Sequence, residues 1–326
     1  MKILVTGGTG YIGSVAIRRL MAAGHEISVF DNVERGHRES LPAGVPLVVG
    51  DLRDASAIRS AMAAAKPDAV MHFAAYALVG ESMRQPELYF GNNVVGGVNL
   101  LEAMRECGVG RIVFSSSCAT YGEPGTDLID ETTPQKPTNP YGESKLMFEK
   151  MLAWHAKLHG LGYVALRYFN ACGATDELGE DHRVPCETHV IPLVLRVALG
   201  QEPKARIFGD DYATPDGTCI RDYVHVSDLA DAHLRAIESS FTGALNLGTG
   251  HGYSVKEIVE SARRVTGHAI PAEVTPRRGG DPDRLVARVG RAEEVLGWKA
   301  SFTEIDSIME TAWKWHKEHP DGYQPR

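Results

Sequence analysis

A tyrosine and a lysine four residues apart, Tyr141 and Lys145, occur in the segment NPYGESK. On a helix, residues at this spacing share one face, so the lysine ammonium would lie beside the phenol. A phenol that acts as a base at neutral pH must lower its pKa from ~10 to ~7, which corresponds to roughly 4 kcal/mol. The lysine ammonium, together with the positive ring of a bound cofactor, would act in that direction. Tyr141 is a candidate catalytic base, and Lys145 is the residue that would adjust its pKa. Eleven tyrosines nevertheless make a chance match of this spacing common.

A candidate proton relay precedes this pair. Ser117 ends the run RIVFSSS, whose apolar, β-branched start predicts a buried strand. Three successive hydroxyls are poor core material, and open α/β sheets bind ligands beyond the carboxyl ends of their strands. Ser117 is therefore expected to pass a proton between a substrate hydroxyl and the Tyr141 phenol. A local hydrogen bond from its side chain to the backbone is the alternative.

A glycine-rich segment near the N-terminus, GGTGYIG, contains Gly7, Gly10 and Gly13 between a predicted strand and a predicted helix. In this context glycines permit a tight turn and a close approach to a pyrophosphate, whose charge meets the helix N-terminus. Asp31 ends the second predicted strand, where a carboxylate accepts the ribose hydroxyls of NAD and repels the 2′-phosphate of NADP. NAD is the predicted cofactor, with NADP as the alternative because Arg35 lies nearby.

Two further strand ends fit the same cofactor. Asp51 and Leu52 follow the third predicted strand, from which a carboxylate and an apolar side chain can hold the adenine. The alternative for Asp51 is an N-cap in the segment DLRD. Ala74 and Ala75 end the fourth predicted strand, where small side chains leave room for a ligand.

Short apolar runs alternate with helix-length amphipathic stretches through the first half of the chain. The predicted strands span residues 2–7, 26–31, 46–51, 69–75, 111–117 and 163–170. Such alternation implies right-handed crossovers and a doubly wound parallel sheet with helices on both faces. Asn139 and Pro140 supply the N-cap and first residue of a helix that runs to about His159, with Gly160 closing it.

The pattern changes after residue 188, which indicates a smaller second lobe. Residues 172–188 read as a long functional loop, and the strand-like segments 205–209 and 243–250 are assigned to the second lobe. The predicted division is a dinucleotide-binding domain over 1–175, with a returning segment at about 220–240, and a mainly substrate-binding lobe over 176–326.

Composition excludes several classes of function. The 326 residues are 43% hydrophobic and 23% charged, and no apolar run approaches the ~18 residues that span a bilayer. The N-terminal apolar run is too short for a signal peptide, and the five cysteines lack Cys-x-x-Cys spacing, so a cytoplasmic protein with reduced thiols is expected. A net charge of −8 without charge blocks argues against nucleic-acid or membrane partners. His155 and His159 have metal-ligand spacing but read as a solvated helix face, so no metal site is predicted.

Longer motifs carry a family resemblance. The segment FGDDYATPDGTCIRDYVHVSDLADAH (208–233), together with LRYFNACGA, HVIP and PRRGGDP, resembles the extended short-chain dehydrogenase/reductase family, and within it the sugar-nucleotide 4-epimerases, over essentially the whole chain. The resemblance implies a Rossmann domain with a smaller C-terminal α/β lobe and a tightly bound NAD. It also implies reversible inversion at C4 of a UDP-hexose through a 4-keto intermediate. A cytoplasmic homodimer, paired through the helix after the fourth strand and the Tyr141 helix, is implied as well.

The resemblance also assigns residues. It makes Ser117, Tyr141 and Lys145 the catalytic group, with Ser117 also touching substrate and the other two also touching cofactor. To the cofactor contacts named above it adds Tyr11, Ile12, Asn32, Phe73, Asn92 and Phe169. The resemblance assigns binding of the uridine diphosphate and its ribose to Asn170, His189, Phe208, Arg221, Arg278 and Asp281. Arginines suit a diphosphate, an aromatic ring stacks on uracil and a carboxylate accepts from ribose, although for the two arginines a surface ion pair is the alternative.

The chain departs from the family at three positions. Ala77 stands where some members carry a lysine that reaches the nicotinamide ribose, and Tyr76 is the candidate replacement. Arg288 replaces a more common aspartate, which nothing in the sequence explains. Leu285 is smaller than the tyrosine of hexose-specific members, so acceptance of UDP-N-acetylglucosamine is an open alternative.

Two other classes of function stay open from the sequence. A related sugar-nucleotide oxidoreductase or dehydratase would share the first half of the chain. A dehydratase requires an acidic pair after the catalytic hydroxyl, and this chain has Cys118 and Ala119 there, which argues against that activity. A non-catalytic NAD-sensing protein would be expected to lose part of the Ser117, Tyr141 and Lys145 group, and all three are present.

Overall fold

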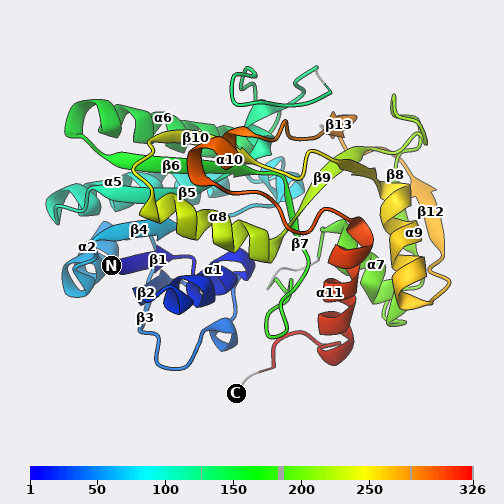
Figure 1. Ribbon diagram of the computed structural model, residues 1–326, viewed down its shortest axis with the longest axis horizontal. Coiled ribbons are helices and arrows are strands. Elements are labelled where there is room, and N and C mark those ends of the chain that lie inside the picture. Colours follow the sequence, from blue (N-terminus) through cyan, green and yellow to red (C-terminus); the bar gives the residue numbers. More distant parts are fainter. Residues whose placement is uncertain (126, 183–186, 280, 325–326) are drawn as a thin grey trace.

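A seven-stranded parallel sheet forms the larger part of the computed structural model, which describes residues 1–125, 127–182, 187–279 and 281–324 (Figure 1). The strand order is β10-β6-β5-β4-β1-β2-β3. These strands span Lys2–Thr6 (β1), Glu26–Asp31 (β2), Leu47–Val49 (β3), Ala69–His72 (β4), Arg111–Ser117 (β5), Gly162–Tyr168 (β6) and Gly243–Leu247 (β10). The chain direction across the sheet reverses between β1 and β4, which is where such sheets bind ligands. The predicted doubly wound fold is confirmed.

Helices cover both faces of this sheet because each crossover carries an apolar stripe. The helices are α1 (Tyr11–Ala22), α2 (Ala55–Ala65), α5 (Gly96–Glu106), α6 (Pro140–His159) and α8 (Val226–Glu238). Helices α1 and α8 lie side by side on one face and share a core with Ile17 and Leu229 (Figure 1). Helices α2, α5 and α6 close the other face around Met62, Leu100 and Phe148.

Short elements after β4 and β5 line the carboxyl edge of the sheet. They are α3 (Val79–Ser82), α4 (Pro86–Tyr89), the π-helical segment η2 (Phe90–Val95) and the 3-10 turn η3 (Cys118–Tyr121), with a further 3-10 turn η1 (Arg38–Ser40) after β2. Strand β4 is shorter than predicted and ends at His72, so Phe73, Ala74 and Ala75 lie in the loop beyond it. These residues therefore lie at the carboxyl edge of the sheet, where Phe73 and Ala74 also pack against the two cores.

A smaller lobe packs beside the ligand edge and has its own core around Leu195, Ile258 and Ile308. Its elements are β7 (Asn170–Cys172), α7 (Val190–Ala198), β8 (Ala205–Phe208), β9 (Ile220–His225), β11 (Gly252–Ser254), α9 (Val255–Thr266), β12 (Ala272–Thr275), β13 (Arg284–Leu285) and α11 (Ile305–Glu318). Strand β9 is flanked by β11 and β13 and also pairs with β7, while β8 pairs with β12. Figure 1 shows α7, α9 and α11 grouped at the end of the molecule away from β3.

One strand was assigned to the wrong lobe. The segment 243–250 was expected in the second lobe, but β10 is the edge strand of the large sheet and pairs in parallel with β6, Leu245 opposite Leu166. Helix α8 supplies the crossover, and α10 (Arg291–Leu296) packs against β10. Among the described residues, no helix combines the length and apolarity required to cross a membrane.

Candidate active site

Local signals place Tyr141 and Lys145 in the first turns of α6. The Asn139 side chain accepts a hydrogen bond from the Gly142 N–H at 2.9 Å, which caps the helix as predicted. Gly160 ends the helix at φ 71°, in the left-handed region. The Lys145 Nζ atom lies 5.8 Å from the centre of the Tyr141 ring, so the predicted pair does meet on one face.

Lys145 is deeply buried, with 3% of its surface exposed. Its ammonium donates to the Ser115 carbonyl at 2.6 Å and lies 4.8 Å from the centre of the Phe114 ring. Burial lowers the pKa of Lys145 to about 7, and the charge of Glu149 only partly opposes this. The lysine therefore titrates near neutral pH in the chain without ligands.

Tyr141 has a raised pKa in the chain without ligands. Burial raises its pKa to about 12, and a hydrogen bond with Ser117 offsets only part of that rise. The expected lowering of the phenol pKa depends on Lys145 together with the positive nicotinamide ring, so it stays a prediction for the NAD-bound chain. Both groups lose water on folding, and the ammonium is directed at the Ser115 carbonyl rather than at the phenol oxygen.

Ser117 makes the local hydrogen bond to the backbone that is the alternative to a relay role. It ends β5 and caps η3, where its Oγ accepts from the Ala119 N–H at 3.1 Å. The same hydroxyl is hydrogen-bonded with Tyr141. Because one hydroxyl can accept from the backbone and still exchange a proton with a phenol, the local bond is compatible with a relay role.

The glycine loop forms a cradle that no larger residue could build. Gly7 has φ 76°, and a Cβ atom there would lie 2.4 Å from the Ala74 backbone nitrogen. At Gly13 a Cβ atom would lie 2.3 Å from the Gly7 carbonyl oxygen. The turn thus holds the start of α1, at Gly10 and Tyr11, tight against the end of β4. These features fit a dinucleotide whose pyrophosphate lies on the helix N-terminus.

Asp31 ends β2 with a buried carboxylate that is already oriented. One oxygen accepts from the Thr9 N–H at 2.9 Å and the other from the Val33 N–H at 2.8 Å. Each carboxylate oxygen keeps a second lone pair, which fits the two hydroxyls of an adenosine ribose. Arg35, the residue for which NADP was kept as the alternative cofactor, forms an ion pair with Glu81 at 2.9 Å. Its charge is therefore directed at Glu81 and not at the space beside Asp31.

Asp51 is engaged by its neighbour Arg53, whose Nε and Nη2 atoms lie 2.9 and 2.6 Å from its oxygens. These hydrogen bonds lower the pKa of Asp51 to about 2. The alternative N-cap role for Asp51 is wrong, since Asp54 caps α2 by accepting from the Ser56 and Ala57 N–H groups. Leu52 is buried beside it, and its carbonyl accepts from Asn99, a residue that the sequence did not single out.

The remaining predicted cofactor residues lie around the same edge. Ile12 lies in the first turn of α1 and Asn32 directly follows β2. The Tyr11 hydroxyl donates to the Gly173 carbonyl at 2.5 Å. Asn92 is buried in η2, and Phe169 is buried directly after β6. These residues therefore follow β1, β2 and β6 at the carboxyl edge of the sheet, except Asn92, which lies in the helical segment between β4 and β5.

The predicted substrate residues come from the smaller lobe. Asn170 begins β7 and His189 precedes α7. An Arg221 Nη2 atom lies 3.5 Å from an Asp281 oxygen, and the Arg278 guanidinium stacks 3.8 Å above the Phe208 ring. Arg221 thus forms the ion pair that was the alternative to diphosphate binding. Arg278 forms no such pair with a described residue, and it covers a face of the Phe208 ring, on which a uracil was expected to stack.

His189 lies beside two carboxylates. Its Nδ1 atom is 2.7 Å from Glu187 and 3.2 Å from Glu180. Burial alone would lower its pKa, but the negative charge of Glu180 and the hydrogen bond to Glu187 raise it to about 9. The sequence analysis named His189 without either partner, although the repeated Glu-x-His spacing at 180–182 and 187–189 was a visible signal.

A further group that sequence reasoning missed joins the loops after β2 and β4. The Tyr76 hydroxyl donates to Glu34 at 2.5 Å, and the Arg35 guanidinium stacks 4.1 Å from the centre of the Tyr76 ring while it pairs with Glu81. Because β2 and β4 flank β1, this bridge connects the two sides of the glycine loop. Nothing in the spacing of these residues could have predicted it.

The fold and the site together define a nicotinamide-dinucleotide enzyme of the hydride-transfer type. Residues 3–248 match the family model described as the NAD dependent epimerase/dehydratase family, and the chain belongs to this family. Its cofactor is NAD.

Relatives match along the whole chain. A UDP-glucose 4-epimerase of Halalkalibacterium halodurans is 51% identical, covering 99% of this chain and 98% of its own. The crystal structure of a UDP-glucose 4-epimerase, 51% identical, superposes with a TM-score of 0.95 and covers 99% of both chains. The UDP-glucose 4-epimerase from Bifidobacterium longum, solved in complex with NAD+ and UDP, is 38% identical with a TM-score of 0.94 and covers 99% of this chain and 100% of its own.

Proposed function

We propose that the chain is a UDP-glucose 4-epimerase, which interconverts UDP-glucose and UDP-galactose by transient oxidation at C4. The observation that carries the proposal is the hydrogen-bonded Tyr141 and Ser117 pair, backed by buried Lys145, at the carboxyl edge of the sheet that also carries the glycine loop.

Each residue has a defined task in this reaction. Tyr141, directly or through Ser117, removes the proton from the C4 hydroxyl and later returns it. NAD, when bound, accepts the C4 hydride and gives it back, and its positive charge opposes the burial that raises the Tyr141 pKa. Lys145 stabilises the phenolate from the same helix face. Arg221 and Arg278 hold the diphosphate, about which the 4-keto sugar turns to present its other face.

The direct test is to incubate the purified protein with UDP-galactose and no added NAD, and to follow the anomeric protons by NMR. Formation of UDP-glucose is expected because the hydride returns to the substrate and the cofactor is not consumed. Absence of product that persists after NAD is supplied would contradict the proposal.

A second substrate pair is favoured by the position of Leu285. This residue is buried on β13 and lies opposite Arg221 in the strand register, so it borders the predicted substrate residues. We expect UDP-N-acetylglucosamine to be epimerised as well, and Leu285→Tyr to reduce that activity by ~10-fold or more while sparing UDP-galactose. The same NMR assay checks both sugars, and no turnover of the acetylated sugar by the unmodified chain would exclude this pair.

Replacing Asp31 by asparagine is expected to weaken NAD binding by ~10- to 100-fold, since hydrogen bonds to a charged group contribute about 1.5–3 kcal/mol. The asparagine oxygen can still accept from one of the two backbone N–H groups, of Thr9 and Val33, that Asp31 binds, and thermal unfolding of the variant checks that the fold persists. Calorimetric titration of the stripped protein with NAD measures the change. Unaltered NAD affinity would show that Asp31 serves the loop and not the cofactor.

Replacing Arg278 by alanine is expected to raise the Kd for UDP by ~10-fold or more and to leave NAD content unchanged, because one charged contact to the diphosphate is lost. Arg277→Ala is the matched control, since Arg277 is exposed, stacks on Tyr212 and pairs with Asp211. Equal losses of UDP affinity in both variants would indicate a general charge effect.

The proposal extends to a homodimer formed by η2, α5 and α6. Large apolar side chains are exposed along these helices: Val95, Val98, Met147, Trp154 and Leu158. Light scattering on the eluting protein tests this state. A cytoplasmic location is proposed on the four described cysteines, all of which are free.

A further inference from the structure

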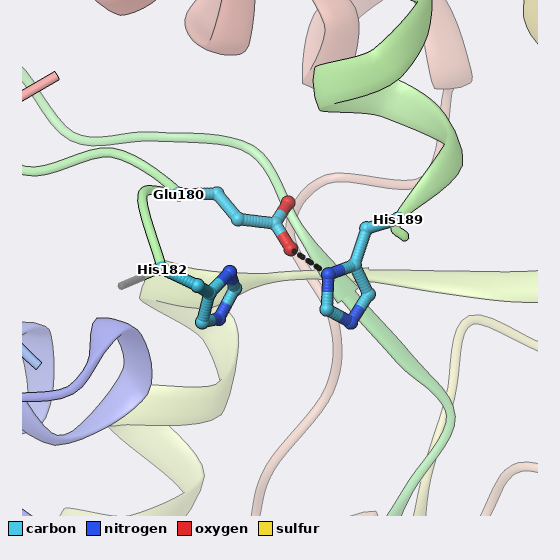
Figure 2. A group of neighbouring side chains, drawn as sticks. All are labelled: Glu180, His182 and His189. Carbon is cyan, nitrogen blue, oxygen red and sulfur yellow. Dashed lines mark ion pairs between the residues drawn. The ribbon is translucent and has the colours of Figure 1, made fainter. Parts of the chain in front are cut away.

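Two Glu-x-His segments meet in the loop that joins β7 to α7. Figure 2 shows Glu180, His182 and His189 turned toward one another. The Glu180 carboxylate is buried, with 5% of its surface exposed, and lies 3.2 Å from His189 Nδ1. Glu187 closes the group, 2.7 Å from His189 Nδ1 and 3.3 Å from His182 Nδ1.

Hydrogen bonds among these side chains do not account for both carboxylates beside His189. Two carboxylates approach His189 Nδ1, which carries at most one hydrogen, so only one contact can be a full hydrogen bond at a time. The ligand atoms of Glu180, His182 and His189 all lie within 4.8 Å of one another. Zn²⁺ binds imidazole nitrogen at about 2.0–2.1 Å and carboxylate oxygen at about 2.0–2.2 Å, so tetrahedral ligands stand about 3.3 Å apart. A bound ion would therefore draw these ligand atoms closer together than their present separations of up to 4.8 Å.

We propose that Glu180, His182 and His189, with Glu187 as the neighbouring carboxylate, form a binding site for Zn²⁺ or a similar first-row divalent cation. Two imidazoles select such an ion over Mg²⁺ or Ca²⁺, which prefer oxygen ligands. This differs from the sequence analysis, which predicted no metal site and considered only His155 and His159.

The ion would fix a segment that links both lobes. Glu180 and His182 belong to the part of the loop after Gly173, whose carbonyl accepts from the Tyr11 hydroxyl, and the His182 ring lies edge-on to Tyr11 at 6.1 Å. His189 directly precedes α7 of the smaller lobe. One cation therefore ties the two ends of the loop together, in a structural role that takes no part in the proton transfer at Tyr141.

The test is zinc uptake by a tag-free chain that still carries its NAD. After equilibration with micromolar Zn²⁺ and gel filtration, elemental analysis is expected to find about one zinc per chain. The Glu180→Gln, His182→Asn double variant removes two ligands and is expected to bind zinc at least ~100-fold more weakly. The His155→Ala, His159→Ala double variant is the matched control and should keep its zinc, because its two imidazoles lie on the surface of α6.

Two further measurements, of Tm and of a Co²⁺ spectrum, test the site without relying on epimerase activity or on the folding of the ligand variant. Zinc should raise the Tm of the unmodified chain by a few degrees and leave that of the ligand variant unchanged. If the ligand variant does not fold, Co²⁺ is added to the unmodified chain instead and its visible spectrum is recorded. The spectrum of a four-coordinate site would support the proposal, and the spectrum of the free aquo ion would contradict it. Zinc uptake that is absent, or equal in the ligand variant, would overturn the site whatever the NMR assay shows.

Discussion

Tyr141→Phe is expected to lower turnover of UDP-galactose by a factor of ~100 or more while NAD stays bound. The substitution removes the hydroxyl that takes the C4 proton and that is hydrogen-bonded with Ser117. The ring remains, with its edge-on contact to Tyr89 at 6.4 Å, so the packing at the start of α6 is preserved. Turnover is measured by the NMR assay and NAD content by chromatography after denaturation.

A matched control separates this effect from the general loss of a phenol. Tyr163→Phe removes a hydroxyl from β6, a strand that begins at the opposite edge of the sheet, and should leave turnover near normal. Near-normal activity in Tyr141→Phe would refute the catalytic assignment. Loss of NAD together with activity would instead place the Tyr141 hydroxyl among the cofactor contacts.

The elements that the sequence predicted correctly are those specified by local signals. Asn139, Pro140 and Gly160 mark both ends of α6 because a cap, a first-turn proline and a left-handed glycine each act within a few residues. The alternation of strands and helices likewise predicts the doubly wound sheet. The cap of α2 was placed at Asp51 as one alternative and is Asp54, since two aspartates in DLRD satisfy the same local rule.

Long-range packing accounts for what the sequence missed. An apolar run such as 243–247 predicts a strand but does not say which sheet it joins, and only the return of α8 puts β10 beside β6. The sequence likewise paired Tyr141 with Lys145 correctly but did not show how deeply the lysine is buried. The desolvation that lowers the pKa of Lys145 depends on residues such as Phe114 and Ser115, which approach from another strand.

The same reasoning applies to the groups at the loops. Glu34, Arg35, Tyr76 and Glu81 meet because β2 and β4 are both neighbours of β1, a relation that the linear sequence does not display. The cluster at Glu180 combines residues 180–182 with residues 187–189, and the repeated spacing becomes meaningful only once these two segments are seen to be in contact.

Lys145→Met is expected to abolish most turnover, by a factor of ~100 or more, and at the same time to stabilise the NAD-free chain in acid. The stabilisation follows from burial, because the fold lowers the pKa of Lys145 from 10.5 to about 7. That change corresponds to roughly 5 kcal/mol of cost for the charged lysine. The lost hydrogen bond to the Ser115 carbonyl offsets about 1 kcal/mol of the gain.

The sign of the pH dependence follows from proton binding. Between about pH 7 and 10.5 the unfolded chain holds a proton on Lys145 that the folded chain has released, so stability of the unmodified chain rises with pH across this window. Below about pH 7 both states are protonated and the full cost remains. The advantage of Lys145→Met should therefore be about 2–4 kcal/mol at pH 6 and disappear toward pH 10.

Urea unfolding of the NAD-free proteins at pH 6 and 9.5 measures this difference. Lys150→Met is the matched control, because Lys150 lies on the exposed face of the same helix, and it should change the free energy of unfolding by less than ~0.5 kcal/mol at either pH. If Lys145→Met were destabilised equally at both pH values, the lysine would be serving the fold as a hydrogen-bond donor. A gain confined to low pH, joined to the loss of turnover, would show that the chain retains an unfavourable buried charge for its effect on the Tyr141 phenolate.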